Sequence, residues 1–537
     1  MGKAARRIDK GYGWKATLRL SPTVTRIVLI LAALIVTEGL CRWGYIKAIT
    51  LIPPTQMAYK LSEIFWTEAF WADALPTLRN IVVAAMTSWI SGVLIGVTLY
   101  ALPKVRHAVE PLIASYYSVP FFAFYPLAVV ILGMNAAPII IMAALFAVVA
   151  MITSTLSGLD QIPSVLRKVG QSFRLGPIRT AVFIELQATM PYLFAGAKLS
   201  LGYSVAGVIG AEFILSDIGL GYAIAYSYGD FDSKRMYALM LFVIIFVILL
   251  LIVVNRLERA LRYRAGASWT INTRRSAPDS HLPRWAEWAI VGVTALCLWQ
   301  GLHWLSSSEA LASPWVTAVK MVELLQSQRF WGHAGETWRA LWLSLVLSCI
   351  CGALLGIWLG MSRYSGEVVE PLIIALQSTP KVTLYPMMLL FFGLGLAAKV
   401  AFGVIHGIIP MTLITLHAIR SINPALLRTA RALRLTAWQT FGTVCLPAAM
   451  PEMVTAARLS FSVTFLGVLI GEMFASQRGL GFLIMTSIGL NDVATIVAVT
   501  VMIGVFSVVV NSGLMLLDDR LHRRSSLPVD IVRGPRR

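Results

Sequence analysis

Residues 236–255 read MYALMLFVIIFVILLLIVVN, twenty consecutive positions without a charged side chain. A helix that crosses a lipid bilayer needs about 20 apolar residues, so this stretch predicts a membrane span. The whole chain has the same character: 58% of its 537 residues are hydrophobic and 13% are charged, where soluble proteins carry roughly 25% charged residues. We therefore exclude a soluble enzyme, a disordered chain and a disulfide scaffold, and predict an all-α polytopic membrane protein.

Twelve segments of this kind can be drawn, in two sets of six. The first set lies near 26–45, 78–101, 110–132, 136–157, 189–213 and 236–256, and the second near 286–305, 338–360, 370–392, 399–419, 449–473 and 494–517. Prolines interrupt the third segment of each set. The first segment looks like a signal peptide, but no small-x-small cleavage site follows it, so we expect an uncleaved span.

The basic residues are unevenly distributed between the spans. The chain has 45 Lys and Arg against 26 Asp and Glu, a formal net charge of +19. With the N-terminus inside, 31 of the 45 basic residues fall in inner segments. By the positive-inside rule this predicts a multi-pass protein of the bacterial plasma (inner) membrane with both termini cytoplasmic. The positive charge then reflects topology, so we expect membrane lipid and no nucleic acid as a partner.

The chain repeats itself at a constant separation of 260 residues. More than a quarter of the 160 positions from Trp71 to Asp230 are identical to their partners from Trp331 to Leu490. Three short matches show the register: Glu110-Pro111-Leu112-Ile113 with Glu370-Pro371-Leu372-Ile373, Tyr125-Pro126 with Tyr385-Pro386, and Gly219-Leu220-Gly221 with Gly479-Leu480-Gly481. Each half has an even number of spans, so we expect two parallel six-helix repeats with a substrate pathway between them.

A long basic loop follows the fourth span of each half, at 158–188 and at 420–448. Both loops contain a short amphipathic helix pattern with basic residues on one side. These residues are Arg167, Lys168 and Arg174 in the first loop, and Arg428, Arg431 and Arg434 in the second. The pattern alone leaves two interpretations open: a helix resting on anionic lipid, or a helix that docks into a groove of a cytoplasmic partner.

The sequence around these loops carries a family resemblance. The second loop ends in Val444-Cys445-Leu446-Pro447, and the span that follows begins with Met-Pro and leads through Glu472 to Gly-Leu-Gly. In this order the elements resemble the permease subunits of binding-protein-dependent ABC importers, in the nitrate, sulfonate, taurine and bicarbonate class. Arg428-Thr429-Ala430 departs from the EAA of the family motif and Arg434 from its glycine, so the detailed coupling contacts differ.

The resemblance implies a fused (tandem) permease with a fold like that of type I ABC importers. The expected parts are an N-terminal cytoplasmic segment with the first span and outer loop (1–74), permease domain 1 (75–259), a linker with the seventh span and outer loop (260–334), permease domain 2 (335–518) and a basic tail (519–537). The implied partners are two cytoplasmic ABC ATPase subunits, which grip the two basic loops, and an extracytoplasmic solute-binding protein. The implied cargo is a small, anionic solute.

The chain shows no chemistry of its own. It has no G-x-x-x-x-G-K-[ST] phosphate loop, so ATP would be hydrolysed by separate subunits and no cofactor is expected in this chain. The five cysteines show no metal or disulfide spacing, and we predict no metal site and no enzyme activity. An ion-coupled secondary carrier with two parallel six-helix repeats is the alternative function, although the two long basic loops favour the ATP-driven importer.

Two kinds of residue mark a possible pathway. Pro120, Pro126, Pro380 and Pro386 interrupt the third span of each half at matching depths, which either exposes backbone dipoles to the solute or produces a simple kink. Lys381 follows Pro380 deep in its span, where its partner in the first half is Phe121. A buried cation is costly unless it faces water or a partner. Lys381 therefore either faces the pathway and favours an anion, or pairs with a buried acid.

Acidic residues also stand at matching places in the fifth spans. Glu212 and Glu472 each come shortly before the outer Gly-Leu-Gly sequence. A carboxylate in both halves could hold the repeats together or gate the outer end, or it could pair with a Lys or Arg of a neighbouring helix. We expect the structural pairing.

Overall fold

The structure is a computed structural model that describes residues 21–116, 124–162, 184–265, 311–474 and 476–525, with isolated positions between 165 and 176 and between 292 and 304. Within these residues the regular elements are all helices. The first half contains α1 (Pro22–Arg42), α2 (Pro54–Ile64), α3 (Glu68–Ala101), α4 (Pro103–Tyr116), α5 (Tyr125–Leu132), α6 (Ala136–Asp160), α9 (Leu186–Leu215), α10 (Leu220–Gly229) and α11 (Ser233–Ala265).

The second half follows the same order. Its elements are α13 (Pro314–Gln326), α14 (Gln328–Met361), α15 (Arg363–Ser378), the short 3-10 helix η4 (Lys381–Leu384), α16 (Tyr385–Phe392), α17 (Leu396–Arg420), α18 (Pro424–Ala432), α19 (Ala437–Thr440), the π-helical turn η5 (Phe441–Cys445), α20 (Leu446–Phe474), α21 (Leu480–Gly489) and α22 (Val493–Ser525). The sequence analysis did not predict the short outer helices α2, α10, α13 and α21.

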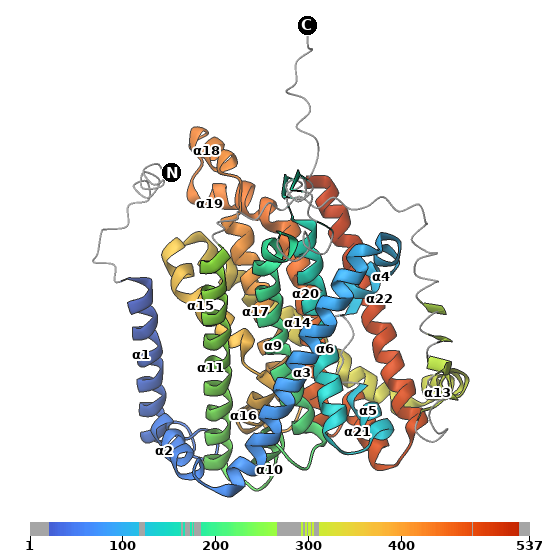
Figure 1. Cartoon of the computed structure of the whole chain (residues 1–537). Helices are drawn as coiled ribbons and strands as arrows, with labels where there is room; N and C mark the ends of the chain where they lie inside the picture. The colour runs from blue at the N-terminus through green and yellow to red at the C-terminus, as the bar shows by residue number, and fades with distance from the viewer. Residues whose placement is uncertain are drawn as a thin grey trace.

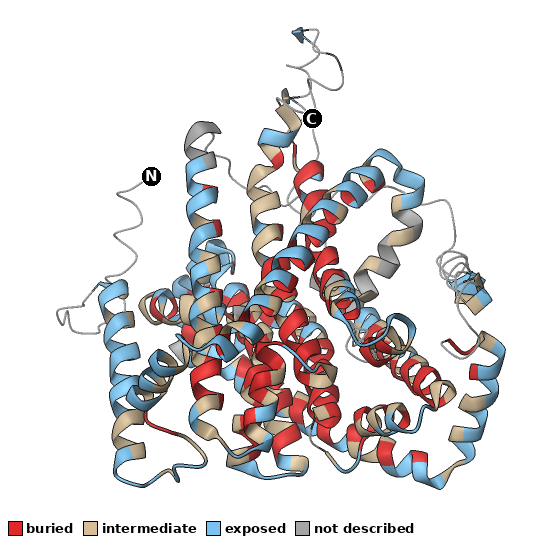
Figure 2. Cartoon of the chain, turned by 60° about the horizontal axis from the view of Figure 1, so that its bottom comes forward, coloured by how far each residue is buried: buried red, intermediate tan, exposed pale blue. Residues whose placement is uncertain are grey.

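In the part of the chain that the structure describes, nine helices are long and apolar enough to cross a membrane. They coincide with nine of the twelve predicted spans, and the prediction of a polytopic helical protein is confirmed. The predicted span at 286–305 falls mostly outside the described residues. In Figure 2 the outer faces of the helices are largely exposed, and α1 has no buried residue at all, as expected for surfaces that lie in lipid.

The third span of the second half is broken at its prolines, as predicted, but its bounds differ from the predicted 370–392. In the second half, α15 begins at Arg363 rather than near residue 370 and ends at Ser378, and η4 and α16 continue the path to Phe392. The first half likewise has α4 and α5 in place of one helix at 110–132. Pro380 precedes η4 and Pro386 stands in the first turn of α16, and a proline is tolerated at a helix start but breaks a helix interior.

Matching bundles form the centre of each half. Helix α6 packs against α3 and α9, and α17 packs in the same way against α14 and α20. Small residues allow the close approach: a Cβ atom at Gly92 would lie 2.5 Å from Met151 Cβ, and one at Gly352 would lie 2.7 Å from Met411 Cβ. Both glycines and both methionines are related by the 260-residue offset, so the internal repeat of the sequence is also a repeat of packing.

The two halves exchange contacts at their edges. Helix α1 packs against α15 of the other half, where Thr25 Oγ1 lies 2.5 Å from Tyr364 OH and Arg26 Nη2 donates to the Glu367 carbonyl at 2.9 Å. In the opposite direction, α5 packs against α21 and α22. These exchanged contacts join the two repeats into one body.

The two ends of the bundle differ. Figure 1 shows α18 and α19 at one end, together with the start of α1 and the end of α22, and α2, α10 and α21 at the other. We call these the α18 end and the α10–α21 end. The basic residues of the second predicted loop lie at the α18 end, and the Gly-Leu-Gly sequences lie at the α10–α21 end.

Candidate functional site

The centre of the candidate site is the contact between the two halves. Helix η4 of the second half packs against α9 of the first half, and η4 begins with Lys381. The Lys381 side chain is half-buried, and its Nζ atom lies 3.5 Å from the carbonyl oxygen of Gln377. Among the described residues, no carboxylate lies within 4.0 Å of it. The structure thus places η4, which begins with Lys381, against α9 of the other repeat, and Lys381 lacks the acidic partner among the described residues that one interpretation required.

The prolines line up with this contact in the residues that can be compared. Pro380 and Pro386 are buried on either side of η4, and Pro126 is buried at the start of α5. Pro120 lies outside the described residues. After these breaks, α5 and α16 both begin with a Tyr-Pro pair at matching positions of the repeat, and whether the backbone dipoles of the broken spans face a solute stays a prediction.

Aromatic side chains from both halves meet near the α10–α21 end of this contact. The rings of Phe213 and Phe474 have centroids 4.1 Å apart, and Tyr228 and Tyr385 lie 5.8 and 5.6 Å from the Phe474 ring. The Tyr385 hydroxyl donates to the Gly471 carbonyl at 2.7 Å. We call Phe213, Tyr228, Tyr385 and Phe474 the aromatic cluster. The sequence analysis missed it, because Phe474 has Ile214, not a ring, at its repeat position.

Glu212 bonds within its own half. Its side chain is 1% exposed and accepts hydrogen bonds from Thr77 Oγ1 at 2.7 Å and from the Gly221 N–H at 3.2 Å. Thr77 Oγ1 also accepts the Leu220 N–H at 2.8 Å. The carboxylate therefore fastens the first turn of α10 to α3. Gly219, which leads into α10, has a φ of +118°, and a Cβ there would lie 2.4 Å from the Glu212 carboxyl carbon.

Glu472 repeats this arrangement and adds a cation. It is fully buried and accepts from Thr337 Oγ1 at 2.8 Å and from the Gly481 N–H at 3.1 Å. Lys399 lies beside it, 2% exposed, with its Nζ atom 4.0 Å from Glu472 Oε1 and 3.4 Å from Glu336 Oε1. The same ammonium group donates to the Arg478 carbonyl at 2.7 Å.

Among the described residues, the hydrogen-bond partners of both glutamates lie in their own half, so these carboxylates hold the outer helices α10 and α21 in place rather than joining the repeats. Lys399 is a residue that the sequence analysis missed. A lysine near the end of an apolar span is usually taken for an interfacial anchor. Its position next to an acid became visible only when α17, α14 and α20 were placed together.

The predicted coupling residues lie in different situations. Arg428 and Arg431 are exposed on α18, and Arg434 is exposed just after it with a φ of +55°. Leu426, Leu433 and Trp438 are exposed around them. Arg167, Lys168 and Arg174 lie outside the described residues. The second loop therefore presents exposed basic and apolar side chains at the α18 end, and their role in docking a partner stays a prediction.

The repeated helical unit identifies the protein family. Residues 88–266 and 352–526 each match the family described as "Binding-protein-dependent transport system inner membrane component". The two matches together cover well over half of the chain. The chain belongs to this family. It is a multi-pass membrane permease of the ABC importer type with two copies of the family unit, and a transport component rather than an enzyme. This decides against the ion-coupled carrier.

Individual relatives of this permease match less than half of this chain. The taurine transport system permease protein of Escherichia coli is 25% identical over 191 residues, which are 36% of this chain and 70% of the relative. The nitrate import permease protein of Synechococcus elongatus is 24% identical over 200 residues, 36% of this chain and 72% of the relative. The riboflavin transport system permease protein of Chloroflexus aurantiacus is 29% identical over 230 residues, 42% of this chain and 86% of the relative.

Proposed function

We propose that this permease forms the complete pathway of an importer by itself, with the solute passing between its two halves. The observation that supports this proposal is the contact of η4 with α9, because it joins the element that begins with Lys381 in one repeat to the fifth-span helix of the other. A separate ATPase pair would then act on a single polypeptide. The domain boundaries given above, 75–259 and 335–518, are the two units in this proposal.

The orientation follows from charge. The α18 end would face the cytoplasm, where the loops at 158–188 and 420–448 each contact one of two ABC ATPase subunits. Arg428, Arg431 and Arg434 would provide the charged contacts, and the exposed Leu426 and Leu433 would be the apolar anchors. This chain would bind no cofactor, since ATP is hydrolysed by the partner subunits. Closure of those subunits would shift the halves between two states.

The α10–α21 end would face an extracytoplasmic solute-binding protein. The aromatic cluster closes the contact between the repeats at that end, where Phe213 of α9 meets Phe474 of α20. Opening toward the binding protein would separate these two rings. Glu212 and Glu472 accept hydrogen bonds from the first turns of α10 and α21. These bonds would keep the outer helices attached to their own halves during this movement.

The solute is proposed to be small and anionic. One relative is named for taurine, which carries a sulfonate group, and another for nitrate, which is an anion. Lys381 has no carboxylate partner among the described residues, and the residue at its repeat position in the first half is Phe121. Lys381 would therefore give the pathway one positive group. A cation in a site of low dielectric attracts an anion more strongly than it would in bulk water.

Solute uptake by the Lys381→Ala variant, compared with uptake by the unchanged permease, tests the proposed role of Lys381 in the pathway. The permease would be reconstituted with its ATPase and binding protein, and uptake of labelled solute measured at several salt concentrations. Loss of a charged contact predicts an apparent KM about tenfold higher and a weaker dependence on salt. Lys320→Ala, which removes a lysine of an outer-helix ion pair, is the control. Unchanged affinity and salt dependence in Lys381→Ala would remove Lys381 from the pathway.

A further inference from the structure

A pocket opens in the first half at the α10–α21 end. It has a volume of about 250 Å³ and lies among α3, α5, α6 and the loop after α9. Its lining includes Arg79 and Asn80 of α3, Ile139 of α6, and Ser216, Asp217 and Ile218 of the loop after α9. One water needs about 15 Å³, so the pocket has room for a small organic molecule.

The second half fills the equivalent place with its own side chain. The 260-residue offset relates Ile139 to Lys399, and Ile218 to Arg478. Lys399 Nζ donates to the Arg478 carbonyl oxygen at 2.7 Å and lies 3.4 Å from a Glu336 oxygen and 4.0 Å from a Glu472 oxygen. The repeat positions of these two acids are Pro76 and Glu212. In the first half the equivalent residue is Ile139, which lines the pocket together with Ile218. The second half is therefore a template that shows an ammonium group bound at this place in the fold.

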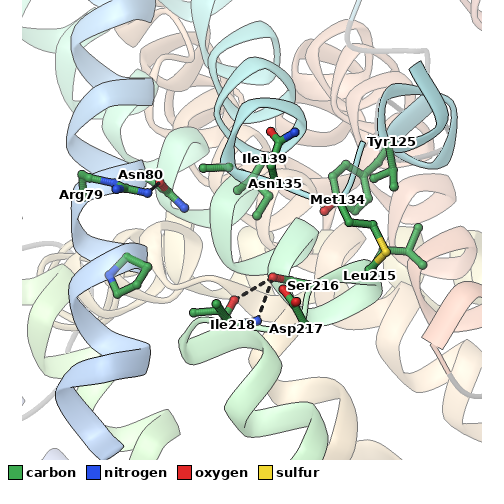
Figure 3. Close-up of a pocket in the computed structure, with 13 residues that line it drawn as sticks. Arg79, Asn80, Tyr125, Met134, Asn135, Ile139, Leu215, Ser216, Asp217 and Ile218 are labelled. Atoms are coloured by element: carbon green, nitrogen blue, oxygen red, sulfur yellow. Dashed lines mark hydrogen bonds between the residues drawn. The ribbon is translucent and has the colours of Figure 1, made fainter. Parts of the chain in front are cut away.

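The acceptor of the template is also present in the first half. The Arg478 carbonyl accepts a hydrogen bond from Ser476 Oγ at 2.6 Å as well as from Lys399, and the Ile218 carbonyl accepts from Ser216 Oγ at 2.7 Å. A carbonyl oxygen has two lone pairs, so the Ile218 carbonyl retains the acceptor that its counterpart gives to an ammonium group. Figure 3 shows this carbonyl side of the loop together with Asp217.

Two groups of opposite charge stand at the pocket. Asp217 comes from the loop after α9, and Arg79 comes from α3 on the opposite side (Figure 3). Arg79 Nη2 donates to Asn80 Oδ1 at 3.4 Å, and neither charged group has an ion-pair partner among the described residues. Such an arrangement complements a molecule that is positive at one end and negative at the other.

We propose that this pocket binds a small zwitterion with a primary ammonium group and an acidic group two or three carbons away. The ammonium group lies beside the Ile218 carbonyl, as Lys399 Nζ lies beside the Arg478 carbonyl in the second half, and Asp217 of the same loop is its acidic neighbour in the pocket. The acidic group faces the Arg79 guanidinium. The site lies within the first repeat and is separate from the contact between the halves that carries Lys381.

Calorimetry on the purified full chain in lipid nanodiscs, without ATP or partner subunits, tests the ligand chemistry. Taurine has both charged ends, isethionate replaces the ammonium by a hydroxyl, and ethanolamine lacks the sulfonate. Taurine is expected to bind at least about tenfold more tightly than either analogue, because each charged hydrogen bond contributes to the affinity. Equal binding of isethionate and taurine, or no binding of taurine, would overturn the proposal.

Substitutions then locate the site. Ile139→Lys places in the first half the side chain that fills the second, and should abolish taurine binding, while Ile139→Leu should preserve it. Because a buried lysine could impair folding, Arg79→Gln is the second test: it should weaken taurine about tenfold and leave ethanolamine unchanged. Arg339→Gln, the equivalent change in the second half, is the matched control. Taurine binding that survives both Ile139→Lys and Arg79→Gln would contradict the assignment.

The same measurement in Lys381→Ala separates this inference from the proposed function. Taurine binding at the first-half pocket should be unchanged in that variant, because Lys381 belongs to the contact between the repeats. A loss of taurine binding in Lys381→Ala together with unchanged binding in Arg79→Gln would place the ligand in the pathway and overturn the pocket assignment. A failure of ATP-driven uptake would leave the calorimetric result untouched.

Discussion

Glu212 and Glu472 occupy equivalent places in the two halves, yet their surroundings differ. Each carboxylate accepts hydrogen bonds from a threonine of the second span and from a backbone N–H of an outer helix. Glu472 also has Lys399 beside it, and the position of Lys399 in the first half is Ile139. The hydrogen bonds from the threonine and the outer helix to the carboxylate are thus common to both repeats. Among the described residues, a cation beside the carboxylate is present in the second half alone.

This difference has a physical consequence. A buried ion pair contributes little over an apolar replacement of the whole pair, but removing one partner leaves an uncompensated charge. The second half should therefore depend strongly on Lys399, while the first half should tolerate changes to its acid. Four predictions follow this difference from its largest to its smallest expected effect.

Lys399→Ile gives the second half the residue of the first and should have the largest effect. It leaves Glu472 and Glu336 without their cation, and we expect unfolding free energy to fall by about 3–5 kcal/mol. Chemical unfolding in detergent would measure this loss. Lys320→Ala, which breaks the ion pair with Glu323 at the protein surface, should cost at most about 1 kcal/mol. Equal losses in the two variants would show that Lys399 is not a buried ion-pair partner.

Glu472→Gln compared with Glu212→Gln tests the same asymmetry from the acidic side. Glutamine keeps an acceptor for the threonine and the backbone N–H, but it removes the charge that Lys399 faces. We expect Glu472→Gln to lower the unfolding free energy by about 2–3 kcal/mol, and Glu212→Gln to change it by less than about 1 kcal/mol. The reverse order of the two losses would contradict the comparison.

Thr77→Val and Thr337→Val test what the halves share. Each change removes the hydroxyl that donates to the buried carboxylate and accepts the first N–H of the outer helix. We expect a loss of about 1–2 kcal/mol in both cases, since each leaves a buried acceptor with one partner fewer. Hydrogen exchange in α10 and α21 should rise to a similar degree. A large effect in one half alone would mean that the two halves do not share this hydrogen-bonded link between the threonine, the carboxylate and the outer helix.

Ion pairs at the α18 end should have the smallest effect. Arg106 of α4 pairs with Asp160 of α6 at 2.6 Å, and Glu370 of α15 pairs with Arg420 of α17 at 2.8 Å, so the signs are reversed between the halves. Both pairs are partly exposed, and Arg106→Gln or Arg420→Gln should each cost at most about 1 kcal/mol. The double variant Arg106→Asp with Asp160→Arg exchanges the two charged residues, and its unfolding free energy should return to that of the unchanged protein. Failure of the exchanged pair to recover would show that the contact is not ionic.

Much of this architecture could be predicted from sequence. Long charge-free stretches such as 236–255 identify spans because a helix in lipid must be apolar over its whole length. The 260-residue offset predicted two copies of one unit because it held through loops as well as helices. The matching acids Glu212 and Glu472 were found by the same offset, since a repeated carboxylate in an apolar segment stands out.

The features that were missed depend on which helices are neighbours. The aromatic cluster joins residues that the repeat does not align. Lys399 of α17 lies beside Glu336 of α14 and Glu472 of α20. The pocket lined by Arg79 and Ile139 lies where the second half has Lys399 in place of Ile139, and an apolar residue in an apolar span gives no signal of a cavity. Such contacts are set by packing and not by the local pattern.

Cross-linking the halves across the aromatic cluster tests the central claim that the solute passes between them. In a variant without the five native cysteines, Phe213→Cys with Phe474→Cys would be joined by a short bis-maleimide in the reconstituted importer. We expect ATP-driven uptake to stop when the cross-link forms, and to continue in Phe213→Cys alone after the same treatment. Uptake that persists with the cross-link in place would contradict a pathway between the two repeats.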